Sequence, residues 1–427
     1  MGVATTYSTA DSDKRFPPDT RHPPATMFRH TPRARTLLAL SLTALVFAIA
    51  GCAGGPSRSG DAARAADGFG PQARVAVLLP ESGRFAGPAE AVKAGILAAH
   101  GVGRQGARPE LRFYDSSDPA AVPGLLRQAA ADGATFAIGP LQKESVAAVA
   151  GAGALPVPTL ALNRANVASL PPNLYQFALS PEDEAEEVAD SAWGQGLRSA
   201  LMLHPSGSWG ERIASAFRQR WTALGGQLIA ARTYSPTTGS YTSAVTGLFG
   251  EPGAGTADFL FLVATSQIAR AIAPELQAAA GGLPVYATSH IFGGSFDSQY
   301  DGPLVGMQFV DIPWLLASDP SDPLSKEQLQ IGLADFEGRF TRLYAMGIDA
   351  YQLAPRLEWM ATRPGAYVDG KTGRLTLDTR RQVRRELILA RMGSGGPVRV
   401  AAIAPAPEHL EPAAAGTAAP RIASVRP

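Results

Sequence analysis

The body of the chain alternates short apolar runs with segments whose apolar residues recur at helical spacing. Short apolar runs bounded by Pro, Gly or Asp are typical of strands buried on both faces, and helices between such strands produce a parallel sheet. The first series therefore predicts an α/β unit. Its expected strands are Arg74–Leu79, Leu111–Tyr114, Thr135–Ile138 and Val157–Leu162, and its expected helices are Ala86–His100, Ala120–Ala131 and Lys143–Ala150.

A second α/β series begins at Pro181, so the pattern predicts two similar lobes, each a parallel sheet flanked by helices. The sequence carries no repeat with a period of about 20–50 residues, which excludes a solenoid. The expected strands of this series are Ala200–Leu203, Leu228–Tyr234, Phe259–Val263 and Val285–Thr288, and its expected helices are Pro181–Trp193, Ser208–Leu224, Tyr241–Phe249 and Gln267–Ala279.

The last part of the chain departs from this alternation and is expected to revisit both lobes. Its expected elements are a strand at Met307–Val310, helices at Lys326–Ala345 and Ala350–Thr362, a hairpin at Gly370–Leu377 and a strand at Glu386–Arg391. Two or three crossovers result, and such an arrangement supports hinge closure. The expected first lobe is 74–180 plus about 304–362, the second is 181–303 plus about 363–392, and the Gly-, Pro- and Ala-rich residues 393–427 are expected to be a disordered tail.

The N-terminus has the pattern of an export signal. Residues 29–35 are basic, residues 37–50 are almost entirely apolar, and small residues precede Cys52, the only cysteine of the chain. This order is typical of a secretory signal, and the apolar run is too short to span a bilayer comfortably. Small residues before a cysteine resemble the bacterial lipobox, which predicts a signal peptide at 27–51, lipidation of Cys52 and a tether at 52–73. The alternative to a lipidated cysteine is an ordinary cleaved signal. Met27 is the expected start of the protein, so residues 1–26 are expected to lie upstream of the true start.

Ligands of open parallel sheets bind at the carboxyl ends of the strands. The loops at these ends are expected to line a cleft between the lobes, which is the place for any small-molecule ligand. The candidate residues are Ser82, Gly83, Gly139, Pro140, Leu141, Asn163, His204, Ser206 and His290. The two histidines can each hydrogen-bond a ligand, although a packed loop histidine is the commoner case.

Six sequence blocks follow the lipobox in order: Val75–Gly83, Gly139–Val146, Val157–Asn163, Leu174–Ala185, Gly347–Leu353 and Gly370–Asp378. Together they resemble the LppC/LpoA lipoproteins, a family known as penicillin-binding protein activators. The resemblance implies a type I periplasmic-binding-protein-like fold, a place at the periplasmic face of the outer membrane, and activation of a class A penicillin-binding protein without catalysis or a cofactor. Known members carry a helical-repeat domain ahead of this body. The alternative function is that of a lipid-anchored solute-binding receptor of an ABC transporter.

Motifs that would indicate an enzyme occur without their required context. Gly101–Gly106 matches GxGxxG but follows a helix instead of a strand, which indicates a loop. Lys371–Gly373 matches the KTG triad of penicillin-interacting enzymes, but the SxxK and SDN motifs are absent, so we expect a hairpin turn. The six histidines form no HExxH motif and no i,i+4 pair, so no metal site is expected. A net charge of +1 predicts no nucleic-acid partner.

An acidic run opens the helix expected at Pro181–Trp193; it consists of Glu182, Asp183, Glu184, Glu186 and Glu187. Carboxylates at a helix N-terminus compensate the helix dipole. Glycoside cleavage needs two carboxylates facing each other across a cleft, and neighbours on a helix point apart. We therefore expect a solvated face here, with a partner surface as the alternative.

Overall fold

The computed structural model describes residues 68–70, 72–102, 108–167, 169–237, 239–329, 338 and 340–401. All of them belong to the compact unit Ser57–Pro427. The signal peptide, Cys52 and most of the expected tether lie outside the described residues. Within the described ranges, every helix is too short or too polar to cross a membrane.

The first lobe contains a five-stranded parallel sheet in the order β2-β1-β3-β4-β5. Its strands are β1 (Arg74–Leu79), β2 (Glu110–Asp115), β3 (Phe136–Ile138), β4 (Thr159–Ala161) and β5 (Leu174–Gln176). The five apolar residues of β1 are buried because helices cover both faces of the sheet, as its continuous apolar pattern predicts. The sequence pattern missed β5, a three-residue edge strand, because so short a run has no recognisable period.

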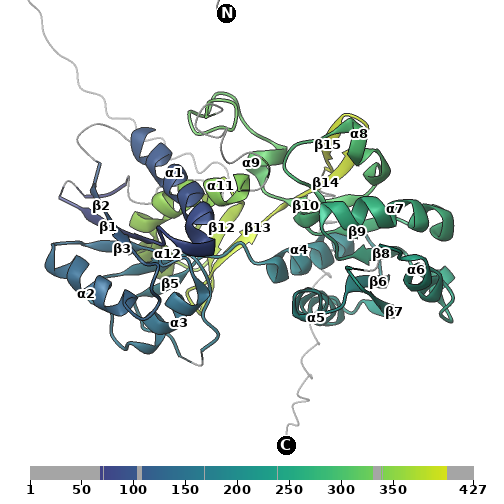
Figure 1. Ribbon diagram of the computed structural model, residues 1–427, viewed down its shortest axis with the longest axis horizontal. Coiled ribbons are helices and arrows are strands. Elements are labelled where there is room, and N and C mark those ends of the chain that lie inside the picture. Colours follow the sequence, from purple (N-terminus) through teal and green to yellow (C-terminus); the bar gives the residue numbers. More distant parts are fainter. Residues whose placement is uncertain are drawn as a thin grey trace, which may run out of the picture. The chain divides into compact units, whose positions relative to one another are not determined.

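The helices of this lobe are α1 (Ala86–Val102), α2 (Val122–Ala131), α3 (Lys143–Gly151), α11 (Thr341–Leu353) and α12 (Leu357–Ala361). In Figure 1, α11 lies beside α1 although the two are far apart in the sequence. A Cβ atom on Gly347 would stand 2.1 Å from the carbonyl oxygen of Val92, so glycine permits this close helix contact. The expected helix break near Gly347 is therefore wrong: α11 runs through this residue, and residues 326–329 form turns instead of a helix.

The second lobe contains a seven-stranded sheet in the order β15-β14-β10-β9-β8-β6-β7. Strands β6 (Ser199–Pro205), β7 (Gln227–Tyr234), β8 (Phe259–Leu262), β9 (Val285–Ala287) and β10 (Gln308–Asp311) are parallel, whereas β14 (Ile388–Gly393) and β15 (Gly396–Arg399) are antiparallel. The main helices are α4 (Pro181–Gly194), α5 (Ser208–Ala223), α6 (Thr242–Phe249) and α7 (Ser266–Ala280), and the short ones are α8 (Ser298–Asp301) and α9 (Pro313–Leu316). Residues 393–399 are therefore not a tail: their glycines form the turn of the β14–β15 hairpin, in which Gly396 has a φ of 117°.

A small antiparallel sheet joins β11 (Tyr367–Asp369), β12 (Arg374–Leu377) and β13 (Val383–Glu386). The side chains of Leu375 and Val383 pack into the hydrophobic core that contains β1, α1 and α11. This sheet therefore belongs with the first lobe, whereas β10 pairs within the second sheet. Both placements differ from the expected boundaries, since the apolar pattern identifies strands without identifying their partners.

The chain passes between the lobes three times, in agreement with the two or three crossovers expected. It crosses at 177–180 after β5, at 311–312 after β10, and at 386–387 between β13 and β14. The side chain of Leu387 contacts a core cluster of each lobe. Helix α4 begins directly after the first crossing, so its N-terminal residues lie close to the other two.

Candidate functional site

A pocket lined by residues of both lobes contains two of the expected candidates, and we call it the cleft pocket. It has a volume of about 530 Å³. Its lining includes the expected candidates Leu141 and Asn163, together with Lys143, Arg164 and Arg212. The amide of Asn163 donates to the carbonyl oxygen of Leu141 at 3.1 Å, so the two loops hold each other in place. Helix α3 starts at Lys143, and its N-terminus adds partial positive charge to this pocket.

The other candidate residues do not line the cleft pocket. Gly139 and Pro140 are buried at the end of β3, where a Cβ on Gly139 would stand 2.1 Å from the carbonyl oxygen of Leu78. Close strand packing therefore explains this glycine. Ser82 and Gly83 are exposed ahead of α1, and the backbone N–H of Ser82 donates to the hydroxyl of Ser117 at 3.0 Å.

The candidates of the second lobe also have local structural partners. His204 is buried, and its Nδ1 lies 3.2 Å from the carbonyl oxygen of Pro205, as expected for a packed histidine. Ser206 is exposed, and its N–H donates to the carbonyl oxygen of Tyr234 at 2.8 Å. His290 has a local partner and a distant one: its Nδ1 lies 3.1 Å from the hydroxyl of Thr288 and 3.5 Å from a carboxylate oxygen of Glu184, in the acidic run at the start of α4.

The acidic run is not a solvated face, and the expectation for it is wrong at its two central residues. Asp183 and Glu184 are each only 4% exposed. Asp183 accepts two hydrogen bonds from the guanidinium of Arg164, at 2.7 and 2.6 Å, and a third from Arg384 at 3.1 Å. Arg384 also pairs with Glu186. These bonds connect a first-lobe loop and strand β13 to helix α4, so they join segments on either side of two crossings.

Glu184 makes a second set of contacts near the three crossings, which we call together the crossover region. Its carboxylate accepts hydrogen bonds from the N–H and the hydroxyl of Ser289, each at 3.0 Å. A guanidinium nitrogen of Arg385 lies 4.0 Å away. Burial by itself would raise the pKa of Glu184, but His290 and the charges of Arg385 and Arg342 outweigh it and lower this pKa to about 2. Glu184 is therefore an anion at every physiological pH.

Arg342 on α11 connects the lobes at the second crossing. Its Nε donates to Asp311 at 2.8 Å, and its Nη2 donates to the carbonyl oxygens of Ser289 and Phe292 at 3.3 and 3.1 Å. The carboxylate of Asp311 is completely buried, so removing either partner would leave an uncompensated charge inside the protein.

The KTG motif has a structural role, which agrees with the hairpin expected at Gly370–Leu377. Lys371 and Thr372 lie in the turn between β11 and β12, beside α11. The buried carboxylate of Asp349 on α11 accepts from the N–H of Lys371 at 2.6 Å and from the N–H and hydroxyl of Thr372 at 2.7 and 2.6 Å. Lys371 itself pairs with Asp322.

The sequence analysis did not identify the arginines that pair with the acidic run. Arg164 follows the candidate Asn163 directly, and Arg384 and Arg385 lie between two expected strands. Several acids at a helix start, together with an arginine directly after the strand-end residue Asn163, could have suggested ion pairs. The described residues contain no group of three or more His, Cys, Asp or Glu side chains arranged to hold a metal ion.

A protein-family model with the description "LppC putative lipoprotein" matches residues 69–395. The chain belongs to this family. The match covers the described body almost completely and confirms the resemblance that the six sequence blocks indicated.

The named relatives include the "Penicillin-binding protein activator LpoA" of Serratia proteamaculans, which is 33% identical over 308 residues, or 64% of this chain and 44% of that protein. The protein of the same name from Klebsiella pneumoniae is 32% identical over 65% of this chain and 43% of its own length. The LppC-family chain described here thus spans less than half the length of these relatives.

Solved structures confirm the expected α/β fold of this LppC-family protein. The C-domain of LpoA from Haemophilus influenzae, described as a regulator of PBP1A, matches with a TM-score of 0.65 at 25% identity, over 77% of this chain and 100% of that domain. Full-length LpoA of that organism matches with a TM-score of 0.64 at 26% identity, over 77% of this chain and 59% of its own. A Chromobacterium violaceum structure assigned to a branched-chain amino acid ABC transporter matches with a TM-score of 0.59 at 29% identity, over 75% of this chain and 100% of its own.

Proposed function

We propose that this protein is a lipid-anchored regulator at the periplasmic face of the outer membrane, which binds and activates a class A penicillin-binding protein. The observation that carries the proposal is the match to the C-domain of Haemophilus influenzae LpoA, a regulator of PBP1A, because the alignment covers that entire domain. The curated relatives carry the name penicillin-binding protein activator. The proposal assigns neither catalysis nor a cofactor to the chain.

The bonds across the crossover region support a role in binding. An activator that acts by contact gains affinity when its own surface is held in the bound shape before the encounter. The pairs Asp183–Arg164, Asp183–Arg384 and Asp311–Arg342 fix the segments that connect the two lobes. A partner therefore meets a body whose connecting segments are already ordered.

The test uses the lipidated full-length protein in detergent with each class A synthase of its host. We expect co-purification with one synthase and a faster rate of glycan polymerisation or cross-linking when the protein is added. A Cys52→Ser variant is expected to leave the membrane fraction of cells yet still stimulate the purified synthase. No binding and no change of rate with every class A synthase would refute the function, and a Cys52→Ser variant that stays in the membrane would refute the lipid anchor.

A second candidate function is that of a solute-binding receptor of an ABC transporter. The match to the Chromobacterium violaceum structure and the cleft pocket of about 530 Å³ favour it. A receptor is stabilised by its ligand through mass action. A strong rise in melting temperature with a transported solute, abolished by Lys143→Ala in the cleft pocket, would support the receptor and count against the regulator.

A further inference from the structure

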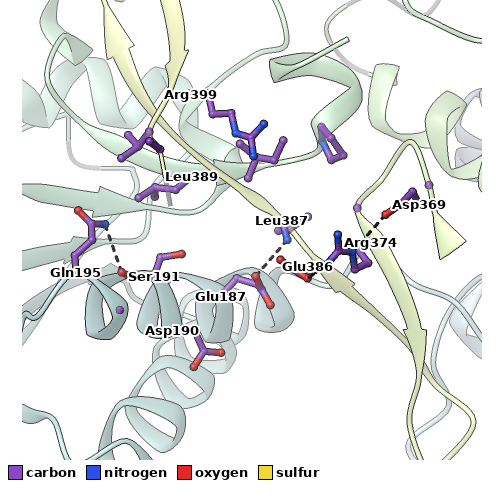
Figure 2. A pocket seen from close by; sticks show the side chains of 17 residues that line it. Glu187, Asp190, Ser191, Gln195, Asp369, Arg374, Glu386, Leu387, Leu389 and Arg399 are labelled. Atoms are coloured by element: carbon purple, nitrogen blue, oxygen red, sulfur yellow. Dashed lines mark hydrogen bonds and ion pairs between the residues drawn. The ribbon is translucent and has the colours of Figure 1, made fainter. Parts of the chain in front are cut away.

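A second pocket lies on α4, beside the third crossing, and we call it the crossover pocket. It has a volume of about 520 Å³. Its lining comes from α4, from the β11–β12 turn, from the end of β13 and the start of β14, from the first residue of α9, and from the residues that end β15. It shares no lining residue with the cleft pocket. Figure 2 shows it with the side chains of Glu187, Glu386 and Arg399 around the space.

Several charges in the crossover pocket neutralise one another or pair outside it. Arg374 lies 3.3 Å from Asp369 and 3.7 Å from Glu386. Asp190 accepts a hydrogen bond from Arg220 at 2.7 Å. Asp369 and Asp190 therefore have hydrogen-bonded partners before any ligand arrives, whereas Glu386 has only the ion pair with Arg374 at 3.7 Å, which is beyond hydrogen-bond distance.

Two charges of opposite sign remain available. The Glu187 carboxylate accepts one hydrogen bond, from the N–H of Leu387 at 3.2 Å, and forms no ion pair with a described residue. Arg399 likewise has no ion-pair partner within the described ranges, and Figure 2 shows its guanidinium directed toward the pocket interior. The two groups line the same cavity without reaching each other.

The groups around Glu187 favour a positive charge beside its carboxylate. Burial, together with the negative charges of Asp190 and Glu386, raises the pKa of Glu187 to about 7. A cation beside Glu187 and Glu386 would relieve this repulsion. An anion at Arg399 would supply the partner that this guanidinium lacks, with charge-assisted hydrogen bonds at both ends.

We propose that the crossover pocket binds a small zwitterion, an amino acid or a short peptide, with its ammonium at Glu187 and Glu386 and its carboxylate at Arg399. The volume lies within the range of about 300–1,000 Å³ typical of small-molecule sites. The bound molecule contacts residues on both sides of the third crossing. This site is independent of the proposed synthase partner, because its ligand is recognised by this chain alone.

Isothermal titration calorimetry of the full-length protein with alanyl-alanine tests the site. N-acetyl-alanyl-alanine lacks the ammonium, and alanyl-alanine amide lacks the carboxylate. We expect millimolar or tighter binding of the free dipeptide and at least about tenfold weaker binding of each blocked form.

Variants assign the two ends of the ligand. Arg399→Ala is expected to reduce the dipeptide affinity to that of the amide and to leave the affinity for the amide unchanged, whereas Arg399→Lys retains part of the difference. Glu187→Gln is expected to reduce the dipeptide affinity to that of the N-acetyl form and to leave the affinity for the N-acetyl form unchanged. Lys143→Ala, in the cleft pocket, is the matched control and leaves the dipeptide affinity unchanged. Unfolding midpoints establish that each variant is folded.

The proposal is overturned if the dipeptide does not bind at millimolar concentration, or if the three peptides bind equally. It is also overturned if Lys143→Ala abolishes binding while Arg399→Ala has no effect, because the ligand then occupies the cleft pocket. None of these outcomes depends on a synthase, so failure here and failure of the proposed function are distinguishable.

Discussion

Replacing Glu187 by Gln should stabilise the protein, and more so as the pH rises. The carboxyl lies on α4 beside Asp190 and Glu386, and burial with these neighbours raises its pKa to about 7 from an ordinary value of 4.5. A raised pKa means that the folded state holds the proton more tightly than the unfolded chain does. The associated stability is present below pH 4.5 and is lost as the pH rises toward 7. Gln keeps an acceptor for the N–H of Leu387 and carries no charge.

The magnitude follows from the two pKa values. At pH 8.5 both states are ionised, and a difference of about 2.5 between the pKa values costs the folded state about 3 kcal/mol. At pH 5.5 only the unfolded chain is largely ionised, so the cost is about 1 kcal/mol. The stability advantage of Glu187→Gln over the wild type should therefore grow by about 2 kcal/mol between these pH values, as an upper value for a carboxyl that keeps some contact with solvent.

Urea unfolding of both proteins at pH 5.5, 7 and 8.5 measures this difference. Glu184→Gln is the matched contrast, one helical turn away on α4. Since the pKa of Glu184 is lowered to about 2, its contribution is lost only as the pH falls below 4.5, so the variant should be less stable by about 3 kcal/mol at all three pH values. A stability difference for Glu187→Gln that does not change with pH, or that falls as the pH rises, would refute the reasoning.

Two further predictions concern α11. Gly347→Ala should destabilise the protein by about 2–3 kcal/mol in urea unfolding, because its Cβ would meet the Val92 carbonyl oxygen at 2.1 Å; Gly101→Ala, at a helical position of α1 with open space, should be neutral or slightly stabilising, and equal effects would contradict the contact. Asp349→Ala should cost about 3–5 kcal/mol, because it leaves the buried N–H and hydroxyl of Thr372 and a further N–H without an acceptor. Thr372→Val should cost less, since it removes only the hydroxyl, and a larger loss for Thr372→Val would be evidence against Asp349 as the centre of these bonds.

Apolar patterning predicted the elements whose burial is complete and local. The bounds of β1 agree with the expectation at both ends, because a strand covered on both faces needs apolar residues throughout. The hairpin around Gly373 also agrees, since a turn depends on a few neighbouring residues. Strand β15 was missed because Gly396–Arg399 is short, contains Pro397, and is stabilised by pairing with β14.

The residues of the candidate site were likewise predicted only in part. Chain topology placed Leu141 and Asn163 at strand ends, and they line one pocket. It could not select among the other strand-end loops, because the backbone of Gly139 packs against Leu78 and the His204 ring faces the carbonyl oxygen of Pro205, and both contacts depend on how the strands pack. The cationic partners of the acidic run come from other segments, and no spacing in the sequence reports them.

The sequence by itself determined the alternation of strands and helices, the family, and the cluster of carboxylates at the start of α4. Tertiary structure alone decided what those carboxylates do, since Asp183 meets Arg384 across 201 positions of the chain. Glu184 and Glu187 are the same residue type one helical turn apart, yet their pKa values move in opposite directions. The physical reason is that a carboxylate's energy depends on the charges and hydrogen-bond donors that surround it in space, and for these two residues that surrounding is supplied by loops and strands far away in the sequence.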